Sequence, residues 1–133
     1  MGLDFMHKLT SGGDFHLRIN VETKTGEVFS STYDSFRILQ ESKNYKLKIG
    51  KITNDDGGPV ISNERNRGFS TYDKNNDKNT QNNCASEFGG GWWFKSCSYS
   101  CFLNGLYTSS FKCDINGEMQ QPIRSSVMMI KRV

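Results

Sequence analysis

The first half of the chain alternates apolar and polar residues in short runs. In segment 14–23, DFHLRINVET, every second side chain is apolar, and these side chains share one face of an extended strand: Phe15, Leu17, Ile19 and Val21. This pattern predicts a half-buried β-strand. Segment 24–27, KTGE, follows as a predicted turn, because Gly26 can take a positive φ there.

Further strands are predicted downstream of this turn. Segment 28–38 is a second, more irregular strand region, and 45–49 alternates again before the turn-forming run NDDGGP at 54–59. No apolar stripe with a helical period persists, which leaves room only for short helices in 33–39 or 84–88. The N-terminal half is therefore predicted to be an antiparallel meander.

Regular patterns disappear between residues 62 and 124. This segment holds every cysteine, the run GGGWWF and the polar run DKNNDKNTQNNC at 73–84. A long irregular stretch inside a compact domain marks either a functional region or disorder, and the cysteines and paired tryptophans argue against disorder. The run VMMIKR at 127–132 is predicted to be a final strand.

Composition narrows the classes of protein to consider. With 133 residues the chain is one domain or a piece of one. Its 17 basic and 14 acidic residues nearly balance and are scattered, so no binding to nucleic acid is predicted. No run approaches the roughly 18 apolar residues that span a membrane, so no membrane insertion is predicted.

All four cysteines fall in the irregular segment: Cys84, Cys97, Cys101 and Cys113. Zinc sites use thiolate pairs a few residues apart, and only Cys97 and Cys101 have such a spacing. An even number of cysteines in a loop-rich segment favours disulfides instead, which indicate an oxidising compartment and hence a secreted protein. Because the first residues lack the apolar run of a signal peptide, the true N-terminus is expected to lie upstream.

Several short motifs occur in the order and spacing of one family. They are Phe69-Ser70-Thr71, the Asp- and Asn-rich loop, Asn83-Cys84-Ala85, Gly90-Gly91-Trp92-Trp93, Cys97, Leu103-Asn104-Gly105-Leu106-Tyr107 and Met129-Ile130-Lys131-Arg132. In this combination the sequence resembles the C-terminal two-thirds of a fibrinogen-like domain, closest in type to ficolin-like proteins and invertebrate fibrinogen-related lectins. The opening residues resemble the family's stretch that leads into its central sheet, so the resemblance covers the whole chain.

The resemblance implies an α+β fold, a truncated fibrinogen C-terminal-like domain with a twisted, mainly antiparallel central sheet. Residues 1–61 would form the sheet region, 62–124 a loop-rich calcium and ligand subdomain, and 125–133 a C-terminal strand that returns to the sheet.

The resemblance also implies covalent and backbone features of the loop-rich segment. Cys84 and Cys97 correspond to the family's disulfide, and Cys101 and Cys113, which lie outside the usual pattern, are then expected to pair with each other. The bond between Ser96 and Cys97 corresponds to one that is cis in many members.

Calcium binding is a further implication of the resemblance. The family's two carboxylate positions fall on Asn75 and Asp77, with backbone carbonyls near Asn79 and Gln81, while Asp73 would support these ligands without contacting the ion. Ca²⁺ takes oxygen ligands, so the amide oxygen of Asn75 still serves, but one negative charge is lost and the expected site is weakened. The alternative is a solvated polar loop without metal.

A ligand pocket beside the calcium loop is implied as well, because many family members are lectins that hold acetyl groups there. The backbone N–H groups of Cys97 and Ser98 correspond to the donors, and Phe88 corresponds to one aromatic wall. Asp114 and Ile115 stand where the family has other pocket residues, and most of the apolar wall is not retained. Acetyl-sugar specificity is therefore in question, whereas the same surface remains a candidate for another ligand.

The predicted function is that of a secreted, calcium-dependent recognition domain, lectin-like, which binds carbohydrate or pathogen patterns in innate defence. A non-lectin adhesion or signalling module with protein partners is the alternative. A third reading is an incomplete fragment without independent activity, whose missing strands leave sheet edges unpaired and apolar surface exposed. The full-length parent is expected to form a homo-oligomer. No enzyme is predicted, because no catalytic grouping of Ser, Cys or His with an acid and no phosphate-binding loop is visible.

Overall fold

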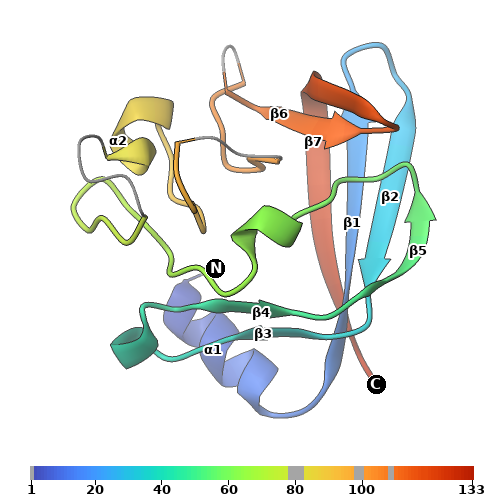
Figure 1. Ribbon diagram of the computed structural model, residues 1–133. Coiled ribbons are helices and arrows are strands. Elements are labelled where there is room, and N and C mark those ends of the chain that lie inside the picture. The colour runs from blue at the N-terminus through green and yellow to red at the C-terminus, as the bar shows by residue number, and fades with distance from the viewer. Residues whose placement is uncertain (1, 78–82, 98–100, 108–109) are drawn as a thin grey trace.

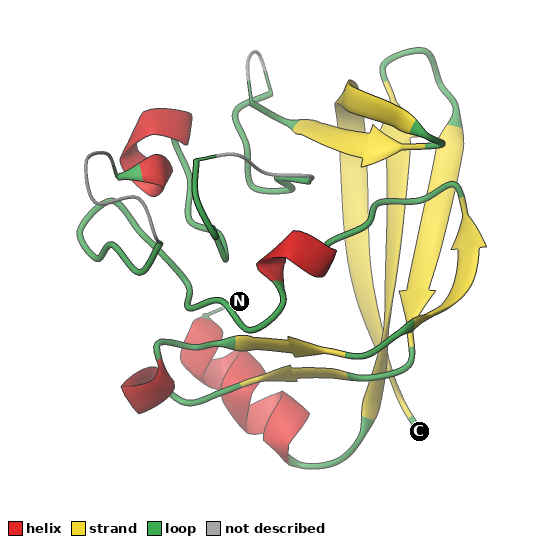
Figure 2. Cartoon of the chain, viewed as in Figure 1, coloured by secondary structure: helices red, strands yellow, loops and turns green. Residues whose placement is uncertain are grey.

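The computed structural model of the chain describes residues 2–77, 83–97, 101–107 and 110–133 (Figures 1 and 2). Its elements in chain order are α1 Leu3–Ser11, β1 Phe15–Thr23, β2 Val28–Tyr33, β3 Phe36–Ile38, the 3-10 helix η1 Glu41–Lys43, β4 Leu47–Ile49, β5 Ile52–Asp56, the 3-10 helix η2 Ser62–Glu64, α2 Cys84–Phe88, β6 Lys112–Ile115 and β7 Glu118–Arg132. Five strands form one antiparallel sheet in the order β5-β2-β1-β7-β6, and β3 pairs with β4 next to α1. The loop-rich segment with α2 lies to one side of this sheet (Figure 1).

Strand β1 is the centre of the sheet, and the predicted alternation is confirmed there. Its residues alternate between buried and half-buried along the whole strand, and the buried ones include Leu17, Ile19 and Val21. β1 pairs with β2 on one side and β7 on the other. One face of this antiparallel sheet packs on the core, so only that face of β1 needs to be apolar. Gly26 takes a φ of 88° in the predicted turn between β1 and β2.

Helix α1 was not predicted, because its apolar stripe is too short to establish a helical period. Two polar side chains help to fix it against β3. The Thr10 hydroxyl donates to Met6 O at 2.8 Å and accepts from Ile38 N–H at 3.1 Å, and His7 Nδ1 lies 2.8 Å from Ile38 O. Of the short helices for which the sequence left room, 84–88 is confirmed as α2, whereas 33–39 contains β3 instead.

The C-terminal strand is longer than predicted. β7 begins at Glu118 and forms a hairpin with β6 through Asn116 and Gly117, which have φ values of 50° and 77°. Polar residues and Pro122 break the apolar alternation in the first part of β7, which hides the strand, but the Asn-Gly pair is itself a strong hairpin signal.

β5 likewise extends into the run predicted as a turn, because it is an edge strand whose exposed residues need not be apolar.

All four cysteines are paired. Cys84 is joined to Cys97 and Cys101 to Cys113, as the resemblance implied. The expectation of a cis bond between Ser96 and Cys97 is wrong, because the described residues contain no cis peptide. The trans form of a bond that does not precede proline is lower in energy by about 3–4 kcal/mol.

No helix among the described residues is long and apolar enough to cross a bilayer.

The core of the loop-rich half encloses one acidic side chain, Glu64. It is only 2% exposed, and Trp92 Nε1 donates to Glu64 Oε1 at 3.4 Å, while Oε2 is buried without a hydrogen-bond partner among the described residues. Burial raises the pKa of Glu64 to about 7; the bond from Trp92 and the backbone amides of Glu64 and Cys101 lower it only in part.

The raised pKa of Glu64 predicts that the stability of the fold depends on pH. Because the folded state binds this proton more tightly than the unfolded state, the free energy of unfolding should fall by roughly 3 kcal/mol as the pH rises from below 4.5 to above 7. In Glu64→Gln, which cannot ionise, that fall should be absent from urea unfolding curves collected between pH 4 and 8. The exposed Glu41→Gln should keep the wild-type slope, and an unchanged slope in Glu64→Gln would contradict the assignment.

Candidate functional site

The polar loop that follows Phe69 is attached to the core by backbone and side-chain bonds. Ser70 and Trp92 exchange two backbone hydrogen bonds, of 2.8 and 3.1 Å. The buried Ser70 hydroxyl accepts from Asn76 N–H at 2.9 Å, and Asn76 Nδ2 donates to Phe69 O at 2.8 Å. The start and the middle of the loop are therefore held together without regular secondary structure.

The candidate calcium ligands that the structure describes lie on successive turns of this loop. Asp73 Oδ1 accepts from the Thr71 hydroxyl at 2.6 Å, and Asn75 Oδ1 accepts from Asp77 N–H at 3.1 Å. Asp77 Oδ2 in turn accepts from Cys84 N–H at 3.2 Å. Asp73 and Asn75 are exposed and Asp77 is half-buried. Asn75 and Asp77 thus share one turn, and Asp73 lies on the preceding one.

The side-chain oxygens of Asp73, Asn75 and Asp77 are of the kind that a calcium site with reduced charge would use. All are oxygens, the type of ligand that Ca²⁺ prefers. Within residues 2–77, 83–97, 101–107 and 110–133, however, no three His, Cys, Asp or Glu side chains gather into a metal-binding group. Asn79 and Gln81, the predicted carbonyl ligands, lie outside the described residues.

Helix α2 and its disulfide close the far end of the loop. Asn83 caps the helix by accepting from Ser86 N–H at 3.3 Å, and its Nδ2 donates to Tyr72 O at 2.9 Å. The bridge from Cys84 to Cys97 then ties the first residue of the helix to the segment that follows Trp93. One asparagine therefore couples the helix to the loop, while the bridge fixes the helix to the core.

A groove of about 520 Å³ runs between the loop and α2. Its lining residues are Thr71, Tyr72, Asp73, Ala85, Ser86, Gly89, Gly90 and Gly91. Tyr72 is 78% exposed, so its ring is available to a ligand next to Asp73. A side chain on Gly90 would meet Asn104 O at 2.5 Å, which explains a glycine there. Tyr72 was not among the predicted site residues, although an aromatic residue inside a polar loop is a usable signal.

The other predicted ligand residues lie in two parts of the structure, around α2 and in the β6–β7 hairpin. The half-buried Phe88 ring packs against Phe94 and Phe102, with centroid distances of 6.0 and 6.3 Å, and Cys97 is half-buried in its bridge. Ser98 lies outside the described residues. Asp114 Oδ1 accepts from Gln120 N–H at 2.7 Å within the β6–β7 hairpin, and Ile115 is buried.

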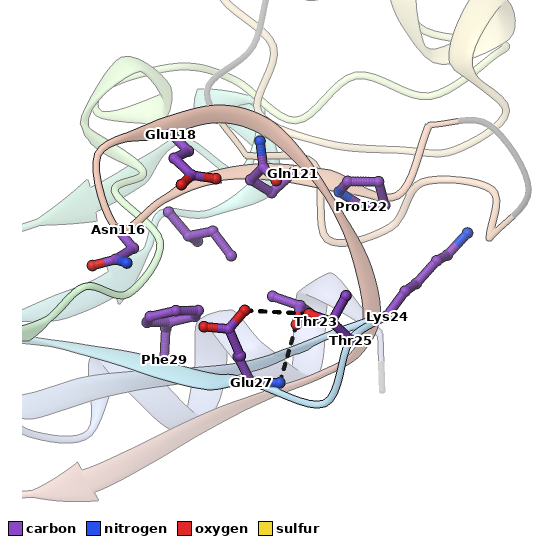
Figure 3. A pocket seen from close by; sticks show the side chains of 10 residues that line it. Thr23, Lys24, Thr25, Glu27, Phe29, Asn116, Glu118, Gln121 and Pro122 are labelled. Carbon is purple, nitrogen blue, oxygen red and sulfur yellow. Dashed lines mark hydrogen bonds between the residues drawn. The ribbon is translucent and has the colours of Figure 1, made fainter.

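Ile115 contributes instead to a second pocket, of about 150 Å³, between the β1–β2 turn and the β6–β7 hairpin (Figure 3). Glu27 and Glu118 lie on opposite sides of this pocket, and Phe29 lies beside Glu27 (Figure 3). Glu27 is tied to the turn, since its N–H donates to the Thr23 hydroxyl at 3.1 Å and its Oε1 accepts from the Thr25 hydroxyl at 3.2 Å. The first bond fixes the backbone of Glu27 to the β1–β2 turn, and the second fixes its carboxylate there.

Comparisons with known proteins agree with this architecture. The family model described as fibrinogen beta and gamma chains, C-terminal globular domain, matches residues 1–131. Ficolin-3 of Homo sapiens is 36% identical over 110 residues, which cover 83% of this chain and 36% of that protein. Tenascin-R of Homo sapiens is 38% identical over 110 residues, which cover 83% of this chain and 8% of that protein.

A solved structure is similar over nearly the whole chain. The fibrinogen-like globe domain of human ANGPTL6 superposes with a TM-score of 0.86 at 28% identity, over 99% of this chain and 63% of that domain chain. This chain therefore spans less than two-thirds of each of these proteins.

Proposed function

This chain belongs to the family of fibrinogen C-terminal globular domains, and on that premise we propose that it is an extracellular, calcium-dependent recognition domain that binds glycans through the groove beside the Asp73–Asp77 loop. The predicted resemblance and the predicted fold class are confirmed. The observation that carries the proposal is the exposed Tyr72 ring beside a loop of oxygen donors. Two disulfides support an oxidising, extracellular location.

Calcium would order the loop that forms one wall of the groove. Asp77 supplies the half-buried carboxylate and Asn75 a neutral oxygen on the same turn. Bound Ca²⁺ would supply positive charge that attracts hydroxyl and carbonyl oxygens of a ligand. Of Asn75 and Asp77 only Asp77 is charged, so the affinity for calcium should depend strongly on each carboxylate that is added or removed.

Two substitutions with opposite effects test this assignment. Asn75→Asp restores a carboxylate and should tighten the calcium Kd by about tenfold, which corresponds to about 1.4 kcal/mol. Asp77→Asn removes the charge but keeps an oxygen that can accept from Cys84 N–H, so the fold should persist while calcium binding is lost. Isothermal titration and thermal unfolding with and without millimolar Ca²⁺ measure both effects.

Two control variants separate direct ligands from general charge effects. Asn54→Asp places the same charge on the exposed edge strand β5 and should leave the calcium Kd unchanged. Asp73→Asn should weaken binding less than Asp77→Asn does. If wild type and Asn75→Asp both give no heat and no thermal stabilisation, the loop is a solvated turn without a metal.

The groove itself is tested through Tyr72. Aromatic rings with one polar end suit ligands that are apolar on one face and hydroxylated elsewhere. Tyr72→Ala should reduce binding to a glycan array at least tenfold, and EDTA should do the same for wild type. Tyr107→Ala removes a comparably exposed ring, 56% exposed, that lies outside the groove, and should not change glycan binding.

A protein-binding role is the second candidate, and exposed apolar side chains support it. Leu106 and Tyr107 are exposed in one loop, and Lys24 Nζ lies 4.6 Å from the Tyr107 ring centroid. Large exposed apolar side chains of this kind are typical of protein interfaces. If no glycan binds with or without calcium, this role replaces the first.

A further inference from the structure

The two-stranded ribbon of β3 and β4 has one buried face and one outer face. The side chains that point inward are apolar and buried, and they are Phe36, Ile38, Leu47 and Ile49. Side chains alternate between the two faces of a strand, so the exposed Arg37 and Lys48 point outward. Arg37 and Lys48 are partners in the register of the ribbon, which places their side chains directly opposite each other.

Both edges of this ribbon are occupied within the chain. Helix α1 bonds to the backbone of β3, and segment 65–67 lies along β4. Leu47 N–H donates to Arg67 O at 3.0 Å, and Asn66 N–H donates to Leu47 O at 2.8 Å. This pairing brings two arginines to the ribbon, although they lie far from β4 in the sequence. The outer face therefore spans three neighbouring backbone segments.

The outer face gathers positive charges that are scattered along the sequence. Segment 43–51, KNYKLKIGK, contains four lysines and no acidic residue, and the fold places Arg37 and segment 65–67 beside it. The acidic residues Asp34 and Glu41 lie beyond the two ends of β3, and neither β3 nor β4 contains a carboxylate. The strands of the ribbon thus present cations and no anion to solvent.

Two of these cations donate to neutral acceptors. Lys48 Nζ donates to Asn66 Oδ1 at 2.7 Å, and Arg65 Nη2 donates to Gly50 O at 2.5 Å. Among the described residues, Arg37, Lys48 and Arg65 form no ion pair. Like charges placed directly opposite each other destabilise a strand pair. The opposed Arg37 and Lys48 therefore do not stabilise the ribbon, and their arrangement favours a role in binding an anion.

We propose that the outer face of β3 and β4, which includes Arg37, Lys48 and Arg65, binds a sulfated polysaccharide without calcium. This site goes beyond the glycan groove proposed above, because it lies on other elements than the groove at α2 and needs no metal (Figure 1). Side chains about 5 Å apart across two strands suit an extended ligand with repeated anionic groups. A guanidinium adds specificity, because its planar fork can donate to two oxygens of one oxyanion.

Other classes of polyanion fit this face less well. Single-stranded nucleic acids stack their bases on aromatic side chains, and membrane surfaces take up apolar side chains. The large apolar side chains that are exposed among the described residues include none between 34 and 67. A sulfated polysaccharide requires only charges and hydrogen bonds, and basic patches are typical of heparin binding. The two disulfides also indicate the extracellular space, where such polysaccharides occur.

The test titrates a short heparin oligosaccharide into the full chain by calorimetry. The sulfated oligosaccharide should bind, and the same oligosaccharide after chemical removal of its sulfates should not. Raising the NaCl concentration from about 50 to about 200 mM should weaken binding roughly 20-fold, because each of three cation contacts releases a counterion. EDTA and Tyr72→Ala should leave the Kd for heparin unchanged, so failure of this site and failure of the calcium groove can be told apart.

Charge reversal on the ribbon separates binding from folding. Lys48→Glu places opposite charges across the strand pair, so the Tm should not fall, whereas heparin binding should weaken by at least about tenfold. Arg37→Glu creates the same pair from β3 and should have the same two effects. Lys131→Glu makes an equal change of net charge at an exposed position of β7 and should alter the Kd for heparin less than about twofold.

Three results would overturn the proposal. Equal losses in Lys48→Glu and Lys131→Glu would show that binding follows the net charge of the chain and not this face. Tighter binding of a single-stranded oligonucleotide, or of vesicles that contain phosphatidylserine, would assign the face to another class of partner. The third is the absence of heparin binding to the wild-type chain at ~100 μM, or its loss on addition of EDTA.

Discussion

The pairing of β7 with β1 is the constraint on which the rest of the structure depends. It runs from Phe15 opposite Arg132 to Thr23 opposite Ile123, so the last strand lies beside the first one at the centre of the sheet. β5 and β6 are consequently the two opposite edges of the sheet. The segment between them, 57–111, must cross from one edge to the other, and in doing so it encloses the aromatic core that contains Trp92, Phe94 and Phe102. The position of segment 57–111 is thus fixed at its two ends by β5 and β6.

In the described part of segment 57–111, hydrogen bonds from side chains to the backbone hold the loops together, as backbone pairing holds the sheet together. Asn76, Asn83 and the Ser70 hydroxyl bond to backbone groups several residues away, and Asn75 accepts from an N–H two residues on. Short polar side chains are suited to this because they compete with backbone partners and stabilise turns. The bonds that Asn75, Asn76 and Asn83 make within the turns therefore explain these three asparagines of the loop. Any ion at Asp77 would bind to a loop that is already partly ordered without it.

The sequence was informative where one physical pattern dominated. Burial of a single face of β1 left a clean alternation. The family resemblance implied the disulfide between Cys84 and Cys97 and left Cys101 and Cys113 to pair with each other, and the structure contains both bridges. α1 was missed because its apolar stripe is too short to establish a helical period, and because the bonds that fix it to β3 come from the polar side chains of His7 and Thr10. The β6–β7 hairpin was missed although Asn116-Gly117 signalled it, because the strands on both sides are polar. The groove beside Tyr72 could not be derived, because it joins residues 71–73 to 89–91 through contacts that no local pattern encodes.

Trp92 links the polar loop to the apolar groove that Leu9, Met128 and Ile130 line. Its backbone pairs with Ser70 and so anchors the polar loop, while its side chain borders the apolar groove together with Phe69 and Trp93. Filling that groove would restrict the same tryptophan that fixes the start of the loop. An ion site with one carboxylate fewer has less binding free energy available to order its own loop, so it depends more on order that the fold provides beforehand. If calcium binds at Asp77 as proposed, its affinity is therefore expected to depend on how firmly the core holds Trp92, and not on the loop residues alone.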